Sequence, residues 1–143
     1  MDAQDIIFSY QRNNAWNMLI SRVQVINQEK DNLICEKAIE DAPSISTLPH
    51  AAIDQIAAII SNDECLATID PEDLDDADRE MELDGYNNSF TFWCKGKAHS
   101  FAIRNASYVF RDKAKDADYI LEKFDQIARI LTKNGVDVEY LKL

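Results

Sequence analysis

The sequence predicts an α+β protein in which N-terminal helices precede a small, mostly antiparallel sheet packed on helices. Three observations lead to this prediction. The first forty residues contain neither Gly nor Pro and place apolar side chains at helical spacing. Residues 88–104 alternate apolar and polar side chains around a central glycine, as a β-hairpin does. Residues 116–133 repeat apolar side chains with the period of an amphipathic helix.

Length and composition indicate one domain, with a helical part over residues 1–61 and a sheet-containing part over 62–143. A chain of 143 residues that is 46% hydrophobic can bury a core of its own. No apolar run reaches the roughly 18 residues of a membrane span, and the start does not resemble a signal peptide. Three widely spaced cysteines are typical of reduced thiols, so we expect a cytoplasmic protein.

The N-terminal part is predicted to form two helices that separate at Asn13-Asn14. The first would cover residues near 3–12, and the second, near 14–41, would be about 40 Å long at 1.5 Å per residue. Its apolar stripe consists of Trp16, Leu19, Val23 and Ile26.

The middle of the chain is predicted to continue with a third helix, near 48–61, and a short strand. The helix has apolar side chains almost all round, which is typical of a central core helix. Residues 65–69 are short and apolar, and we expect a strand there.

The predicted hairpin turns at Gly96-Lys97, with glycine first as in a type II′ turn. Trp93 then falls on the more polar face, where it could contact a partner or lie under a helix. After the helix near 116–133, Asn134-Gly135 is a C-terminal capping signal, and residues 136–143 are predicted to form a final strand in a right-handed crossover. The predicted cross-strand pairs on the apolar face are Cys94 with His99, Phe92 with Phe101, and Phe90 with Ile103.

The acidic segment, residues 70–84, holds nine carboxylates and one arginine, a net charge of −8. The whole chain carries −11, so the remaining residues carry only −3. Asp70 as a cap and Pro71 at the first helical position favour a short helix over 71–82 with its acids in water. A calcium loop is not expected, since Met81 and Asn87 stand where an EF-hand requires glycine and glutamate.

The same segment also fits a docking surface for a basic protein. Like charges at helical spacing repel one another, and a cationic partner would relieve that repulsion and be steered toward the patch. A charge run that only keeps the protein soluble is the competing interpretation. The expected partner-binding residues are Glu72, Asp73, Asp75, Asp76, Asp78, Glu80, Glu82 and Trp93.

No motif of an active site stands out, and we expect neither enzymatic activity, nor a cofactor, nor a metal. The spacings of Cys and His do not match a zinc site, and there is no glycine-rich phosphate loop. A Cys94–His99 nucleophile pair is conceivable across the hairpin, but two residues that end an apolar face are the simpler interpretation. His50 is expected to have a capping or surface role.

The sequence thus predicts a non-catalytic, acidic protein-binding module that occupies a basic surface of a partner protein, of the kind that binds nucleic acid. Inhibitors of the immunity or virus-encoded type have this size and charge. Net charge −11 argues against direct binding of nucleic acid or of an anionic membrane. Two alternatives stay open. One is an assembly protein that oligomerises through the long N-terminal helix, and the other is a small metal-dependent enzyme that uses the acidic segment.

Overall fold

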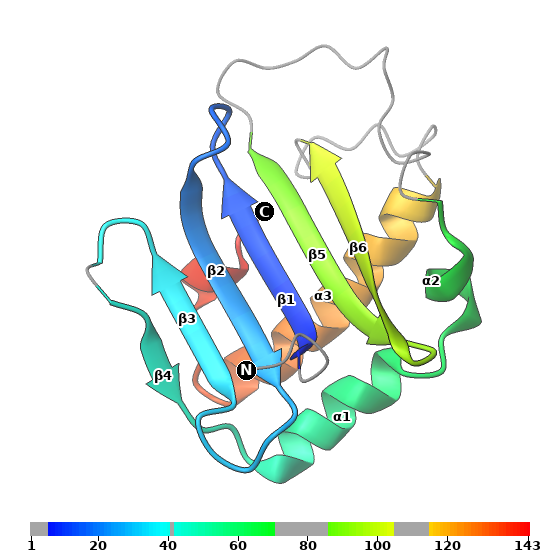
Figure 1. Cartoon of the computed structure of the whole chain (residues 1–143), viewed down its shortest axis with the longest axis horizontal. Coiled ribbons are helices and arrows are strands. Elements are labelled where there is room, and N and C mark those ends of the chain that lie inside the picture. The colour runs from blue at the N-terminus through cyan, green and yellow to red at the C-terminus, as the bar shows by residue number, and fades with distance from the viewer. Residues whose placement is uncertain (1–5, 41, 71–85, 105–114) are drawn as a thin grey trace.

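The computed structural model describes residues 6–40, 42–70, 86–104 and 115–143. It contains one six-stranded antiparallel sheet in the order β4-β3-β2-β1-β5-β6. Helices lie on one face of this sheet, with α3 behind it in Figure 1 and α1 along its lower end. The strands are β1 (Ile6–Asn13), β2 (Leu19–Ile26), β3 (Leu33–Lys37), β4 (Ser44–Ser46), β5 (Asn87–Cys94) and β6 (Lys97–Arg104), and the helices are α1 (His50–Ile60), α2 (Glu64–Thr68), α3 (Lys115–Lys133) and the 3-10 helix η5 (Val138–Leu141).

The prediction of N-terminal helices is wrong, because residues 6–37 form three antiparallel strands. Phe8 and Tyr10 on β1 and Val23 and Val25 on β2 are fully buried, and polar residues alternate with them, which is the period of a strand. The helical stripe was a coincidence of spacing: Trp16 is 81% exposed in a turn, outside both strands.

Asparagine side chains form the turn between β1 and β2 where a helix break was expected. Asn14 Oδ1 accepts hydrogen bonds from the backbone N–H groups of Trp16 (2.9 Å) and Met18 (3.0 Å). Asn17 takes a positive φ of 62°, which asparagine tolerates better than most residues. Asn13 Nδ2 donates a hydrogen bond to Asn17 Oδ1 at 3.0 Å. Side chains of both Asn13 and Asn14 therefore stabilise the turn.

The predicted β-hairpin is present, and its apolar and polar faces are correct, but its register is shifted by two residues. The turn is Lys95-Gly96, and both residues have positive φ (52° and 81°) as a type I′ turn requires. Because the shift is even, every side chain stays on its predicted face. The observed pairs are Cys94 with Lys97, Phe92 with His99, Phe90 with Phe101, and Asn88 with Ile103.

The helix near 48–61 is confirmed as α1, although it is not buried all round. Ile53, Ile56 and Ile60 face the core, while Ala51 and Ala58 are exposed. Alanine tolerates water, so its presence on the outer face does not show that this face is covered.

Two predicted strands are helical instead. Residues 65–69 belong largely to α2, whose first turn is capped by Asp63. The tail forms η5, which Asp137 caps by accepting a hydrogen bond from the Glu139 N–H at 3.0 Å. The predicted strand–helix–strand crossover is therefore absent from the described part of the chain.

The helix near 116–133 is confirmed as α3, and the Asn134-Gly135 signal ends it as predicted, with Gly135 at φ 95°. The apolar stripe of α3 packs on the sheet, where Phe124 lies 4.6 Å from the Tyr10 ring and 5.1 Å from the Phe90 ring, centroid to centroid. Burial of each such side chain contributes about 1.5–3 kcal/mol. This aromatic cluster joins α3 to the middle of the sheet.

Candidate functional site

The face of the sheet that points away from α1 and α3 is the first candidate site, and we call it the open face. No helix among the described residues lies over it (Figure 1). Its side chains are mostly small or polar, with Ile34, Ile45 and Trp93 as the large apolar exceptions, and each described one retains some exposure. The Arg22 guanidinium forms an ion pair with Glu36 of the neighbouring strand, so these charges compensate each other. The other residues of its two central rows are Ser9, Gln11, Gln24, Ile34, Ile45, Ser89, Thr91, Ser100 and Ala102.

Trp93 lies on the open face near the end of β5, opposite Ala98 of β6, and is half-buried. The other predicted partner-binding residues, Glu72 to Glu82, lie outside the described residues, as does the helix predicted over 71–82. The chain leaves the described part after Asp70, beyond α2, and re-enters it at Tyr86, one residue before β5. The acidic segment therefore leads directly into the strand that carries Trp93.

The conceivable Cys94–His99 pair is not formed. Cys94 is fully buried, and its thiol donates a hydrogen bond to the Asp63 backbone oxygen at 2.9 Å. His99 Nε2 lies 3.1 Å from the Cys94 backbone oxygen rather than from its sulfur. Burial raises the pKa of the Cys94 thiol, which disfavours the thiolate that a nucleophile needs.

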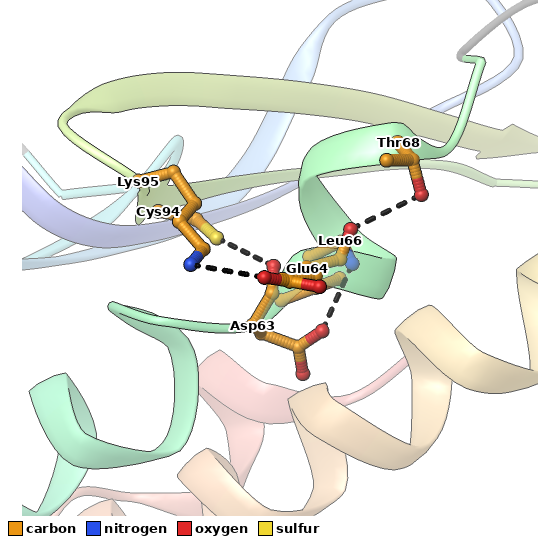
Figure 2. A network of polar contacts seen from close by, with 6 residues as sticks. All are labelled: Asp63, Glu64, Leu66, Thr68, Cys94 and Lys95. Carbon is orange, nitrogen blue, oxygen red and sulfur yellow. Dashed lines mark hydrogen bonds and ion pairs between the residues drawn. The ribbon is translucent and has the colours of Figure 1, made fainter.

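Asp63 is the centre of a polar cluster that joins α2, α3 and the β5–β6 hairpin. Its Oδ1 accepts a hydrogen bond from the Leu66 N–H at 3.0 Å, capping α2, and its backbone oxygen accepts the Cys94 thiol (Figure 2). Its Oδ2 accepts the Tyr119 hydroxyl at 2.6 Å and lies 3.0 Å from Lys123 Nζ. Lys95 Nζ is 3.6 Å from the carboxylate of Glu64 at the start of α2.

The protonation states in this cluster indicate a structural role. Burial alone would raise the pKa of Asp63, but the hydrogen bonds from Tyr119, from the Leu66 N–H and from Lys123 outweigh it and lower that pKa. Burial and the adjacent Asp63 carboxylate raise the pKa of Tyr119. Both groups therefore keep one protonation state near neutral pH, whereas proton transfer in catalysis requires a pKa close to the working pH.

A pocket of about 430 Å³ opens beside the turn of the β1–β2 hairpin. We call it the hairpin pocket; it is at the other end of the sheet from the β5–β6 turn. Polar and apolar side chains share its lining, and η5 contributes Glu139. Three of its polar residues share one row of the sheet, since Arg12 pairs with Ser21 and Ser21 pairs with Lys37, while Asn14 comes from the β1–β2 turn. This row is on the helix-covered face, two residues beyond the buried Tyr10, Val23 and Cys35.

Two polar atoms of the hairpin pocket residues are buried without a hydrogen-bond partner among the described residues. They are Ser21 Oγ and Arg12 Nε, and Ser21 is only 2% exposed. The Lys37 ammonium lies 4.8 Å from the centroid of the Tyr140 ring. Glu139, the carboxylate of the lining, is paired with Lys142 at 2.9 Å. A buried polar atom without a partner costs about 1–3 kcal/mol, so this arrangement calls for an explanation.

Sequence reasoning missed the hairpin pocket because it assigned these strands to helices. The signal was a polar residue at a core-facing position of each of three neighbouring strands. It becomes visible only once Arg12, Ser21 and Lys37 are recognised as members of strands that pair in this register.

Comparison with known proteins gives no relative: no family model, no curated protein and no solved structure matches the chain. In the part of the chain that the structure describes, no three His, Cys, Asp or Glu side chains are grouped so that they could hold a metal ion. Within that same part, every helix is too short or too polar to cross a membrane.

Proposed function

We propose that this protein is a non-catalytic, acidic protein-binding module that occupies a basic surface of a partner protein. The acidic segment attracts the partner, and the open face of the sheet provides the contact area. A cationic surface of this kind is found on proteins that bind DNA or RNA, so the module would act as an inhibitor of such a protein.

The observation that supports this proposal is the direct connection in the chain between a −8 segment and a sheet face over which no described helix lies. β5 begins at Asn87, next to the acidic segment, and carries Trp93 six residues further on. At about 3.3 Å per residue this is a distance of about 20 Å, within the width of a standard interface of about 800 Å² per partner.

The two parts of the proposed surface have different roles. In the two central rows of the open face the charges of Arg22 and Glu36 compensate each other, so these rows add contact area without repelling a cationic partner. Trp93 is its largest aromatic side chain, and tryptophan is over-represented among residues that dominate binding energy. The acidic segment acts at longer range, by raising the association rate.

Free thiols at Cys35, Cys65 and Cys94 support a reducing compartment, and we place the module in the cytoplasm. The assembly alternative has lost its basis, because the long N-terminal helix on which it depended is replaced by strands. The metal-enzyme alternative places its ligands in the acidic segment, and calorimetric titration with Mg²⁺ and Ca²⁺ tests it separately.

The test is a pull-down from cell lysate at low and at high salt with three forms of the protein. The first is the native chain, and the second changes Asp73, Asp75, Asp76 and Asp78 to asparagine. The third is a matched control with the same change in net charge at four exposed positions elsewhere, namely Glu29→Gln, Glu40→Gln, Asp54→Asn and Glu122→Gln.

The proposal predicts a basic partner that is captured by the native chain and the control, is lost with the acidic-segment variant, and is released by salt. Equal capture by all three forms, or capture of no specific protein, would refute it and leave the acidic segment a solubilising feature.

A further inference from the structure

We propose that the hairpin pocket binds a small amphipathic carboxylate, with the carboxylate on Arg12, Ser21 and Lys37 and the alkyl chain on Met18, Leu19 and Ile39. This site is independent of the proposed function, since its polar residues lie on the opposite face of the sheet from Trp93.

The polar side of the pocket presents hydrogen-bond donors. Arg12 and Lys37 have donors and no acceptor, and a hydroxyl such as that of Ser21 donates readily to an anion. Ser21 Oγ and Arg12 Nε lack a partner among the described residues, although both atoms are buried. A carboxylate oxygen accepts from both, which would remove the cost of leaving them unpaired.

The charges favour an anion with a single negative charge. Arg12 and Lys37 bring two positive charges to the lining, and Glu139, which also lies 2.9 Å from Lys142 outside the lining, brings one negative charge. Among the described residues neither cation has a carboxylate within 4.0 Å; each lies near an aromatic ring instead, Tyr86 at 5.0 Å for the Arg12 guanidinium and Tyr140 at 4.8 Å for the Lys37 ammonium. One net positive charge in the lining balances a carboxylate better than a phosphate ester with two charges.

The apolar side of the pocket explains why the ligand should carry an alkyl chain. Met18 is 64% exposed and Ile39 is 90% exposed, and both line the pocket together with Leu19 and Ala38. Large apolar side chains grouped at a concave site are the usual lining of a ligand pocket, and about 430 Å³ falls within the range of such sites.

Binding of octanoate to the full chain, followed by heteronuclear NMR and calorimetry, tests this proposal. The Arg12 Nε–H signal and the backbone amides of Ser21 and Ala38 should shift in a saturable way. Octanol, which has the chain without the charge, and acetate, which has the charge without the chain, should each bind at least tenfold more weakly.

The variants are Arg12→Lys, which keeps the charge but loses the planar fork, Ser21→Ala and Lys37→Met. Each should weaken octanoate binding, by about tenfold for the two cations and by about threefold to tenfold for the serine. Lys97→Met is the matched control, since Lys97 is an exposed lysine at the opposite end of the sheet, and should leave binding unchanged. Circular dichroism shows whether each variant is folded.

Three results would overturn the proposal. The first is no saturable shift of the pocket signals up to about 10 mM octanoate. The second is equal binding of octanol and octanoate, which would mean that the cations take no part. The third is octanoate affinity that is the same in folded Arg12→Lys and Ser21→Ala as in the native chain.

Discussion

Replacing Asp63 with asparagine should destabilise the protein more than the loss of any exposed carboxylate. The Asp63 side chain is 9% exposed and accepts hydrogen bonds from the Tyr119 hydroxyl and the Leu66 N–H, with the Lys123 ammonium 3.0 Å away. Asparagine keeps an oxygen for the Leu66 N–H but loses the negative charge, and its amide NH₂, which is only a donor, accepts from neither Tyr119 nor Lys123.

The magnitude follows from the contacts that are lost. A hydrogen bond to a charged group contributes about 1.5–3 kcal/mol, and removing one partner of a buried ion pair costs about 3–5 kcal/mol. Because Lys123 can turn toward water, we expect a loss of about 2–4 kcal/mol for Asp63→Asn. Asp63→Ala also removes the cap of α2 and should lose about 1 kcal/mol more.

The effect should depend on pH in a defined direction. Hydrogen bonds lower the pKa of folded Asp63 below its ordinary value of 3.8. The carboxylate therefore stabilises the fold fully above that value, and this stabilisation disappears as the pH falls through the lower, folded-state pKa. The difference in unfolding free energy between native protein and Asp63→Asn should accordingly shrink between about pH 5 and pH 2.

Urea unfolding followed by circular dichroism measures these differences. Asp125→Asn is the matched control, since Asp125 is an exposed carboxylate paired with Arg129 at 2.7 Å, and it should change stability by less than about 0.5 kcal/mol. A loss for Asp63→Asn as small as that of the control, or a loss that stays constant down to pH 2, would contradict the role assigned to the cluster.

Three further predictions concern other parts of the fold. Asn32→Ala should cost about 2–3 kcal/mol in urea unfolding, because this fully buried side chain makes hydrogen bonds of 2.6–3.2 Å to backbone groups of two loops. Lys95→Asn should raise the unfolding free energy by about 0.5–1 kcal/mol, since asparagine suits its φ of 52° in the type I′ turn, and a loss would contradict that turn assignment. Among the thiols, the exposed Cys65 should react first with a disulfide reagent at pH 8. Burial raises the pKa of Cys35 to about 11 and also raises the pKa of Cys94, so both are less often thiolates. Mass spectrometry that shows Cys35 or Cys94 modified first would contradict this prediction.

The elements that could be predicted from the sequence are those whose signals are local and long. The stripe of α3 covers five turns and has a glycine at its end, so nothing competes with the helical interpretation. In the β5–β6 hairpin, apolar and polar residues alternate over eight residues in each strand, and this alternation was enough to predict which side chains share a face. Its register depended on a single turn residue, and Gly96 occupies the second rather than the first position of the turn.

The N-terminal strands could not be recognised with the same ease. β1 and β2 alternate buried and partly exposed residues, but bulges near Ile7 and between Arg12 and Asn13 interrupt the period at both ends. The absence of Gly and Pro suggested helices, whereas Asn17 and Asp31 take the positive-φ positions that glycine often occupies. Asn17 and Asp31 in these turns are polar residues that also suit the exposed face of a helix, so they gave no signal of a turn.

The site is harder to predict than the fold because it depends on register. The hairpin pocket needs Arg12, Ser21 and Lys37 to fall in one row across three strands, which only the pairing of those strands decides. The open face likewise exists because α1 and α3 lie on the same side of the sheet (Figure 1). The acidic segment, by contrast, is a property of composition and is visible directly.

The most direct test of the proposed function is the association rate constant for the captured partner, measured by interferometry over a range of ionic strength. The native chain should associate more slowly as salt rises, since the acidic segment acts by electrostatic steering. The variant with asparagine at positions 73, 75, 76 and 78 should associate slowly at every ionic strength. Trp93→Ser should mainly speed dissociation, because Trp93 contributes contact rather than charge. An association rate of the native chain that does not change with salt would contradict the role given to the acidic segment.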